Sequence, residues 1–191
     1  MKNRKLTIQE MNRLTPAQFH ESEKIPLVVV LDNVRSRHNI GAVFRTADAF
    51  RIAGVWLCGC CATPPDAEIH KTALGAEDTV SWQYTEDTKQ AVAQLKQEGY
   101  IVYAVEQTEG SIMLDQLNVG SMAANGCDSL HRPKVAIVLG HEVFGVQQEV
   151  INLCHGCIEI PQYGTKHSLN VSVAAGIVMY VISLRLKVDS L

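Results

Sequence analysis

The stretch PLVVVLDN, residues 26–33, is an apolar run that ends abruptly in an acid and an amide. A strand that is apolar at successive positions is typical of a parallel sheet covered on both faces, because a half-exposed strand alternates apolar and polar residues. Strand and helix patterns alternate along the rest of the chain, with strands expected over residues 54–60, 100–107, 134–140 and 157–162 and helices over residues 38–50, 86–99, 147–154 and 171–186. This alternation predicts an α/β domain with a mainly parallel sheet flanked by helices.

The composition limits the classes of function. The chain has 191 residues, of which 47% are hydrophobic and 19% charged, as expected of a globular protein with a sizeable core. Its net charge of −3 excludes a generally basic nucleic-acid coat, so any phosphate contact must come from a local patch. No apolar signal segment opens the chain, and the apolar run 171–184 is shorter than the ~20 residues of a spanning helix. We therefore expect a cytoplasmic protein without membrane contact.

The chain is expected to consist of a short N-terminal extension, residues 1–25, and a single domain over residues 26–191. Within the extension, Thr15 and Pro16 predict the start of a short helix, because threonine suits the N-cap and proline the first turn. Residues 117–133 are rich in turn formers and predict a loop.

The six cysteines are expected to be thiols rather than a disulfide framework. Cys154 and Cys157 have the C-x-x-C spacing of many zinc ligands, and Cys58, Cys60 and Cys61 form a second cluster. The second cluster falls in and beside a predicted strand, however, where free cysteine commonly acts as a small hydrophobic residue. We therefore predict no metal site.

Three loops that follow predicted strands are unusually polar and rich in glycine: residues 32–45, 140–145 and 161–170. Ligands of open α/β sheets bind beyond the carboxyl ends of the strands, which directs attention to these loops. Neither G-x-x-x-x-G-K-[ST] nor G-x-G-x-x-G follows a strand, so the nucleotide-binding motifs that depend on them are missing from the sequence.

The first of these loops concentrates positive charge in an otherwise acidic chain. Arg35 and Arg37 either contact phosphates or simply keep the loop solvated. Asn39 precedes an apolar helix face and fits an N-cap. Arg45 lies one to two turns into that helix, where its guanidinium could turn back toward the helix N-terminus and bind an anion, with phosphate the first candidate.

The other two loops offer a carboxylate, a hydroxyl and an amide. Gly140 and Gly145 bracket Glu142 and permit a tight backbone, and Glu142 would hold a ribose hydroxyl or an amino group, or else cap the next helix. Ser168 fits the N-cap of the closing helix. Asn170 is a poor interior residue that a cap at Ser168 does not explain. We therefore predict that Ser168 and Asn170 face a pocket.

Together these loops resemble the motifs of the SpoU family, also called the TrmH family, of RNA ribose 2′-O-methyltransferases in the SPOUT superfamily. HNIGAVFRTADAF, residues 38–50, is similar to the first motif, with Asn39 and Arg45 at the marked positions. VLGHEVFGV, residues 138–146, is similar to the second, Gly-x-Glu-x-x-Gly. IPQYGTKHSLNVSVAAGIVMY, residues 160–180, is similar to the third.

The resemblance spans residues 27–186 and implies a SPOUT-type fold. Gln162 stands where the family usually has methionine and Val143 where it often has glycine, and neither change removes a polar catalytic group. The family fold implies a deep trefoil knot in the C-terminal segment, a homodimer, and an active site at the subunit boundary. The N-terminal RNA-binding domain of some relatives has no counterpart in residues 1–25, so a compact form is expected.

The implied activity is the S-adenosylmethionine-dependent 2′-O-methylation of a ribose in tRNA or rRNA. The catalytic positions implied are Asn39, Arg45, Glu142, Ser168 and Asn170. The cofactor positions implied are Val105, Glu106, Leu139, Gly140, Gly145, Ile160 and Leu169. The RNA contacts expected are Arg35, Arg37, His38 and Arg45.

The family's arginine is sometimes described as a base, which a guanidinium of pKa above ~12 makes a poor choice. We instead expect Arg45 to bind the 2′-oxygen and a neighbouring phosphate and to stabilise the developing alkoxide. Asn39 would orient Arg45 or the ribose, and Glu142 would tether a substrate or loop amide. Two alternatives remain open: a knotted RNA-binding protein without methyl transfer, and a small-molecule α/β enzyme with Cys154 or Cys157 as nucleophile.

Overall fold

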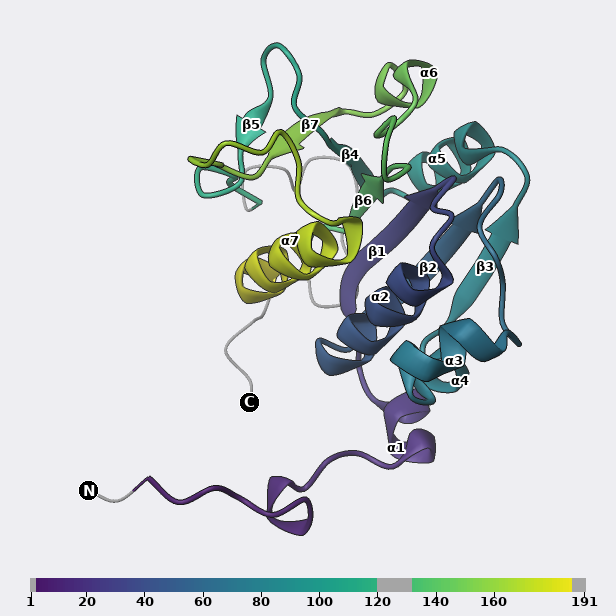
Figure 1. The fold of residues 1–191 in the computed structure, drawn as a ribbon, viewed down its shortest axis with the longest axis vertical. Helices are drawn as coiled ribbons and strands as arrows, with labels where there is room; N and C mark the ends of the chain where they lie inside the picture. The colour runs from purple at the N-terminus through teal and green to yellow at the C-terminus, as the bar shows by residue number, and fades with distance from the viewer. Residues whose placement is uncertain (1–2, 120–131, 187–191) are drawn as a thin grey trace.

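The computed structural model describes residues 3–119 and 132–186. Within them, one seven-stranded sheet has the order β3-β2-β1-β6-β4-β7-β5, and every pairing between neighbouring strands is parallel (Figure 1). The strands are β1 (Ile25–Asp32), β2 (Ile52–Cys58), β3 (Trp82–Thr85), β4 (Ile101–Val105), β5 (Ile112–Met113), β6 (Val135–Leu139) and β7 (Gly156–Glu159). The predicted fold class, α/β with a parallel sheet, is confirmed.

Strand β1 lies in the middle of the sheet because it is apolar on both sides. It pairs with β2 on one edge and β6 on the other, with Val30 level with Trp56 and Val138. Leu27 and Val29 pack into the core on one face of the sheet, whereas Val30 packs into the core on the other. Helices cover both faces, as the uninterrupted apolar run predicts.

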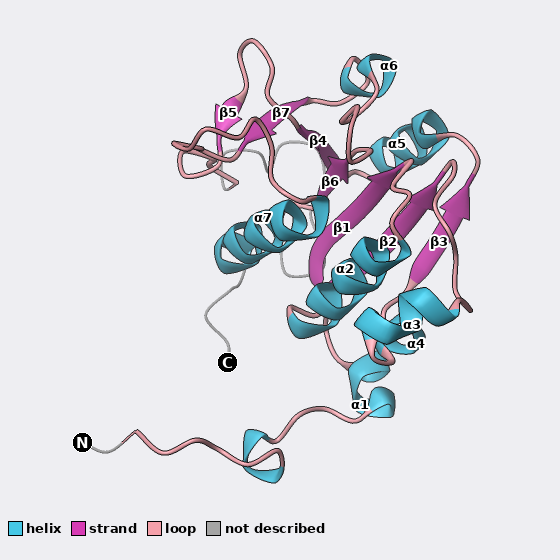
Figure 2. Ribbon diagram, in the orientation of Figure 1, coloured by secondary structure: helices cyan, strands magenta, loops and turns pink. Residues whose placement is uncertain are grey.

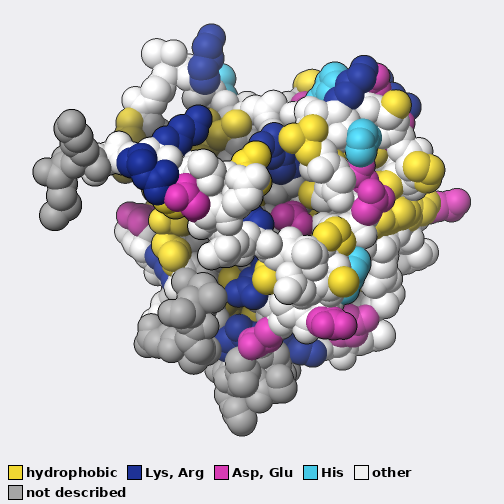
Figure 3. All heavy atoms as spheres, turned by 90° about the horizontal axis from the view of Figure 1, so that it is seen from below, with side chains coloured by type: hydrophobic (Ala, Val, Ile, Leu, Met, Phe, Trp, Pro, Cys, Tyr) yellow, Lys and Arg dark blue, Asp and Glu magenta, His cyan; other side chains and the backbone are white. Residues whose placement is uncertain are grey.

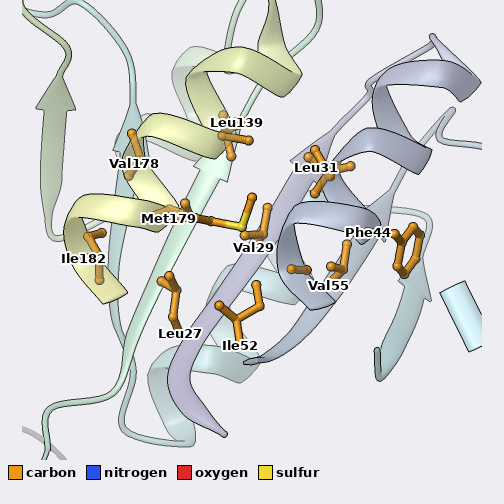
Figure 4. Packing of buried hydrophobic residues seen from close by; sticks show 14 of the residues in the cluster. Leu27, Val29, Leu31, Phe44, Ile52, Val55, Leu139, Val178, Met179 and Ile182 are labelled. Carbon is orange, nitrogen blue, oxygen red and sulfur yellow. The ribbon is translucent and has the colours of Figure 1, made fainter. Parts of the chain in front are cut away.

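The helices form a layer on each face of the sheet (Figure 2). They are α1 (Pro16–Glu21), α2 (Arg37–Ala49), α3 (Ala67–Ala73), α4 (Ala76–Thr79), α5 (Thr88–Gln97), α6 (Gln148–Ile151) and α7 (Val171–Leu186), with a 3₁₀ turn η1 (Gln9–Met11). Helices α2 and α7 bury Phe44, Val178 and Met179 in the core on one face of the sheet, where Figure 4 shows Met179 beside Val29 of β1. Helix α5 packs its Val92 and Leu95 against the opposite face.

Helices α3 and α4 and strands β3 and β5 were not predicted from the sequence. Helix α3 buries only Ile69 and Ala73, which is too short a pattern to recognise, and edge strand β3 is half exposed. The predicted leading helix is confirmed as α1: Thr15 and Gln18 form a capping box, and Pro16 follows the cap. Residues 3–14 lead away from the domain (Figure 1). The predicted loop 117–133 falls mostly outside the described residues.

No helix in the described ranges is both long and apolar enough to cross a membrane. The apolar closing helix α7 instead buries Ala175, Val178, Met179 and Ile182 in the core.

Candidate active site

The loops that follow β4, β6 and β7 enclose a cleft of about 720 Å³ at the carboxyl ends of these strands. A hydrogen bond of 2.7 Å from Gln107 Nε2 to the carbonyl oxygen of His167 joins two of the loops. The cleft is lined by all the residues predicted to bind a cofactor: Val105, Glu106, Leu139, Gly140, Gly145, Ile160 and Leu169. Glu142, Ser168 and Asn170 line it as well.

The two glycines of the second loop allow it to fold tightly. A Cβ on Gly140 would lie 2.0 Å from the backbone carbon of Gly145, and Gly145 has a φ of +67°, where L side chains are strained. A Cβ on Gly145 would also lie 2.1 Å from Glu106 Oε2. The same Glu106 oxygen accepts the backbone N–H of Val146 at 3.1 Å, so Glu106 fixes the loop against the end of β4.

A chain of hydrogen bonds connects the three polar loops at the edge of the cleft. The Glu142 carboxylate accepts the backbone N–H groups of Arg35 (3.2 Å) and Ser36 (3.0 Å) and Nδ2–H of Asn39 (3.1 Å). Asn39 Oδ1 in turn accepts Nδ2–H of Asn170 at 3.2 Å. Residues more than one hundred positions apart in sequence therefore share one polar network.

The anion at the start of α2 is accordingly the chain's own carboxylate. Burial alone would raise the pKa of Glu142, but hydrogen bonds from its own backbone N–H, Ser36, Asn39 and Arg35 outweigh burial and lower that pKa below its usual value. The N-terminus of a helix favours negative charge, which acts in the same direction. The ionised form of Glu142 is thus the one that holds the three loops together.

Two of the predicted helix caps are wrong. The N-cap of α2 is Ser36 rather than Asn39, and its hydroxyl accepts the Asn39 backbone N–H at 3.3 Å. Helix α7 begins two residues later than a cap at Ser168 would require, and Asn170 caps it: Asn170 Oδ1 accepts the backbone N–H of Ser172 at 2.9 Å. The Ser168 side chain makes no hydrogen bond to any described residue, although it lines the cleft.

Arg45 is separated from the other predicted catalytic residues. It lies on the exposed face of α2, opposite the buried Val43, Phe44 and Ala47, and is not part of the cleft lining. Its guanidinium has no hydrogen bond or ion pair with any residue in the described ranges. The expected anion site between Arg45 and the start of its helix is therefore not formed by the residues in the described ranges.

The other residues predicted to contact RNA differ in whether their side chains already have acidic partners. Arg37 Nε donates to Asp66 Oδ2 at 2.9 Å, and His38 Nε2 lies 3.1 Å from Glu68 Oε2, so both residues face acidic groups of α3. The Arg35 side chain is exposed and has no hydrogen-bond or ion-pair partner among the described residues. Arg35 and Arg45 are thus the more available cations of this group.

Sequence reasoning did not identify Asp32, which is fully buried at the end of β1. Its Oδ1 accepts the Thr88 hydroxyl at 2.6 Å, and its Oδ2 accepts the backbone N–H of Gln147 at 3.1 Å. Asp32 therefore ties the loop after β6 to the centre of the sheet. The signal was present, because an acid that ends an otherwise apolar strand must find partners if it is buried.

No group of three or more His, Cys, Asp or Glu side chains in the described ranges could hold a metal ion. The five described cysteines are free thiols. Burial raises the pKa of the Cys154 thiol to about 12, which disfavours the nucleophilic thiolate.

The second and third motif-bearing loops thus line one cleft, and Glu142 and Asn170 hold the first loop, with Asn39, at the edge of it. The sequence profile described as the SpoU rRNA Methylase family matches residues 26–180. The chain belongs to the SpoU family. The family resemblance predicted from the three motifs is confirmed.

Two curated RNA methyltransferases resemble the chain at moderate identity. The 23S rRNA (guanosine-2′-O-)-methyltransferase RlmB of Nitrosomonas europaea is 34% identical over 154 residues, which cover 81% of this chain and 54% of that protein. The tRNA (guanosine(18)-2′-O)-methyltransferase of Thermus thermophilus is 29% identical over 154 residues, which cover 81% and 72% of the two chains. The chain thus spans little more than half the length of the Nitrosomonas relative.

The fold is shared with solved SpoU-family structures. The crystal structure of the Aquifex aeolicus TrmH/SpoU tRNA modifying enzyme superimposes with a TM-score of 0.70 at 26% sequence identity, covering 87% of this chain and 78% of that one.

Proposed function

We propose that this SpoU-family chain transfers a methyl group from S-adenosylmethionine to a ribose 2′-hydroxyl of tRNA or rRNA. The hydrogen-bonded chain Glu142–Asn39–Asn170 carries the proposal, because it joins all three family motifs at one cleft. Family membership supports it, and the two relatives compared above are named as methyltransferases of a guanosine in 23S rRNA and of guanosine 18 in tRNA.

The cleft suits S-adenosylmethionine in size and chemistry. A volume of about 720 Å³ is within the range of small-molecule sites. Leu139, Ile160 and Leu169 offer apolar contacts for an adenine ring, beside polar groups at the rim. Bound there, the cofactor would supply a methyl group already activated by its sulfonium.

The chain's own residues then have to align a weak nucleophile and stabilise charge on its oxygen. In our proposal Glu142 holds the start of α2 in place, which fixes Asn39 beside the pocket. Ser168 and Asn170 shape the pocket wall. Arg45 binds the 2′-oxygen and a neighbouring phosphate, since a guanidinium fork matches anionic oxygens.

We further propose that the chain forms a homodimer in which Arg45 serves the partner's cleft. Helix α7 exposes Val173, Ile177, Tyr180 and Leu184, which recur at helical spacing and form an apolar stripe on its outer side. The stripe lies beside α2, since the Tyr180 and Phe50 rings are 5.9 Å apart. An apolar stripe of this kind suits a subunit contact, and Arg45 on the exposed face of the neighbouring helix would lie close to it.

A mixing experiment tests this arrangement. Arg45→Ala and Asn39→Ala are each expected to be inactive alone. In a mixed dimer one cleft would combine an intact Asn39 with an intact Arg45 of the partner, so random exchange should recover about a quarter of wild-type activity. If Arg45 acts within its own subunit, every cleft of the mixed dimer carries one defect and nothing is recovered.

Arg35, Arg37 and His38 are proposed to contact RNA phosphates together with Arg45. Figure 3 views the end of the domain that carries the N-terminal segment, and there Lys and Arg side chains are mixed with Asp and Glu. That face lies away from the cleft and has no uniformly basic surface. Binding should then weaken with salt according to the few phosphates contacted.

We also propose the trefoil knot and a cytoplasmic location. In support of the knot, the chain leaves β7 near one edge of the sheet and returns as α7 against the central strand β1. The segment between them is bonded to the loop after β4 through Gln107 and His167.

The activity is tested with purified protein, methyl-labelled S-adenosylmethionine and unmodified tRNA and rRNA, followed by mass spectrometry of the nucleosides. A 2′-O-methylated nucleotide is expected, and its loss with Arg45→Ala serves as control. RNA binding without cofactor binding by calorimetry would favour the alternative of an RNA-binding protein without methyl transfer. Inactivation by thiol alkylation, with no dependence on RNA, would favour the small-molecule enzyme.

A further inference from the structure

The turn between His141 and Gly145 presents an aromatic ring to solvent at the mouth of the cleft. The Phe144 side chain is 83% exposed, yet Phe144 also lines the cleft. Its ring lies against the ring of His141, with centroids 5.0 Å apart and planes tilted by 33°. The Phe144 ring therefore rests on the His141 ring beside Glu142, while most of its own surface stays open to solvent.

This turn is held in place from several sides. The backbone N–H groups of His141 and Gly145 donate to each other's carbonyl oxygens at 3.0 and 2.9 Å. His141 Nδ1 accepts the backbone N–H groups of Val143 and Phe144. The Glu142 carboxylate fastens the turn to the start of α2. The outward position of Phe144 is therefore fixed by its backbone.

An apolar ring that is held exposed to solvent at a binding cleft suggests that a ligand packs against it. The proposed substrate supplies one, because a ribose that enters the cleft brings its base and the neighbouring bases with it. Proteins recognise unpaired RNA bases by stacking them on aromatic side chains, whichever base is present. The apolar stripe of α7 is a separate surface, on residues 173–184, and does not include the turn.

We propose that the Phe144–His141 ring pair is a stacking platform for an unpaired nucleobase at or next to the methylated ribose. The proposal rests on the proposed function, since it takes RNA to be the substrate of this cleft. The platform would select unpaired RNA without reading its sequence, and so would restrict the enzyme to loops and bulges.

The test compares Phe144→Ala and Phe144→Trp with the wild type. The probe is a fluorescein-labelled single-stranded RNA dodecamer of random sequence, and its affinity is measured by anisotropy with the full chain. Loss of a base-stacking ring should weaken binding about 5- to 150-fold. Phe144→Trp should bind within about threefold of the wild type, because indole also stacks. Tyr84→Ala is the matched control, since Tyr84 is a half-exposed ring on the distant edge strand β3.

Three results would overturn the platform: Phe144→Ala binding within twofold of the wild type, equal weakening by Tyr84→Ala, or a shift of Phe144→Ala from dimer to monomer in sedimentation. The last result would assign the ring to a subunit contact. Because this assay does not require methyl transfer, its outcome is distinct from that of the proposed function. If the wild type transfers methyl groups and Phe144→Ala binds RNA as tightly as the wild type, only the platform is refuted. If RNA binding depends on Phe144 but no methyl transfer occurs, only the proposed enzymatic activity is refuted.

Discussion

Replacing Asn170 tests whether one side chain both starts the closing helix and joins the site network. Asn170→Ala removes the cap on the Ser172 N–H, and loss of an N-cap costs typically about 1 kcal/mol. It also removes the bond to Asn39, worth about another 1 kcal/mol. We expect the free energy of unfolding to fall by about 2 kcal/mol and the melting temperature by about 4–8 °C.

Asn170→Asp separates the two roles. Aspartate caps a helix as well as asparagine does and places negative charge at the helix N-terminus, so the cap is kept. It has no N–H to donate to Asn39 Oδ1, so the link to α2 is lost. This variant should lie within about 1 kcal/mol of the wild type in stability, yet its methyl transfer should fall with that of Asn170→Ala.

The assay is urea unfolding followed by circular dichroism at one fixed protein concentration, together with methyl transfer to unmodified RNA. Ser168→Ala is the control for stability, because the Ser168 side chain bonds to no described residue and its removal should leave unfolding unchanged. If Ser168→Ala costs as much as Asn170→Ala, the helix begins at Ser168 and the reasoning fails. Equal destabilisation by Asn170→Asp and Asn170→Ala would refute the separation of cap and link.

Three other changes give measurable outcomes. Glu142→Gln should lower the free energy of unfolding above pH ~4.5, where the Glu142 carboxylate is ionised, and should make no difference once the pH has fallen through the lowered pKa of Glu142. The urea midpoints of variant and wild type, measured across pH, test this. A difference between the two midpoints that is the same at all pH values would contradict it. Arg45→Ala should change the free energy of unfolding by less than about 0.5 kcal/mol but abolish methyl transfer, and Arg45→Lys should not restore methyl transfer. If Arg45→Ala still transfers methyl groups, Arg45 has no part in the mechanism. Gly145→Ala should cost about 1–3 kcal/mol and weaken S-adenosylmethionine binding in calorimetry, and unaltered affinity would show that the turn adapts.

The parallel sheet could be predicted because β1 and β6 are apolar at nearly every position, and only burial on both faces explains that pattern. Helix α3 escaped prediction, although Asp66 caps its first turn, because it is short and packs closely against α2. The close approach of the two helices shows this, since a Cβ on Gly41 would lie 2.3 Å from the carbonyl oxygen of Ile69. A local sequence pattern does not predict such a close contact between two helices.

The residues of the cleft were predictable, but the way in which they are connected was not. Asn170 was singled out because a cap at Ser168 would not explain it, whereas Asn170 is itself the cap of α7. Helix ends are set by backbone geometry that sequence patterns locate only to within a few residues. Asp32 went unnoticed because its partners, Thr88 and Gln147, come from distant segments.

The position of Arg45 follows from helix geometry once Asn39 is fixed. At about 100° per residue, a separation of six residues turns the side chain by about 240°, so Asn39 and Arg45 cannot face the same cleft from one helix. Asn39 points toward α7, where it meets Asn170, and Arg45 must therefore point toward solvent. A motif that requires both residues within one straight helix can bring them to a common substrate only if a second subunit, or the RNA itself, bridges the two faces of α2. The apolar stripe on α7 favours the second subunit, and this is why the mixed-dimer experiment decides more about the mechanism than any single substitution.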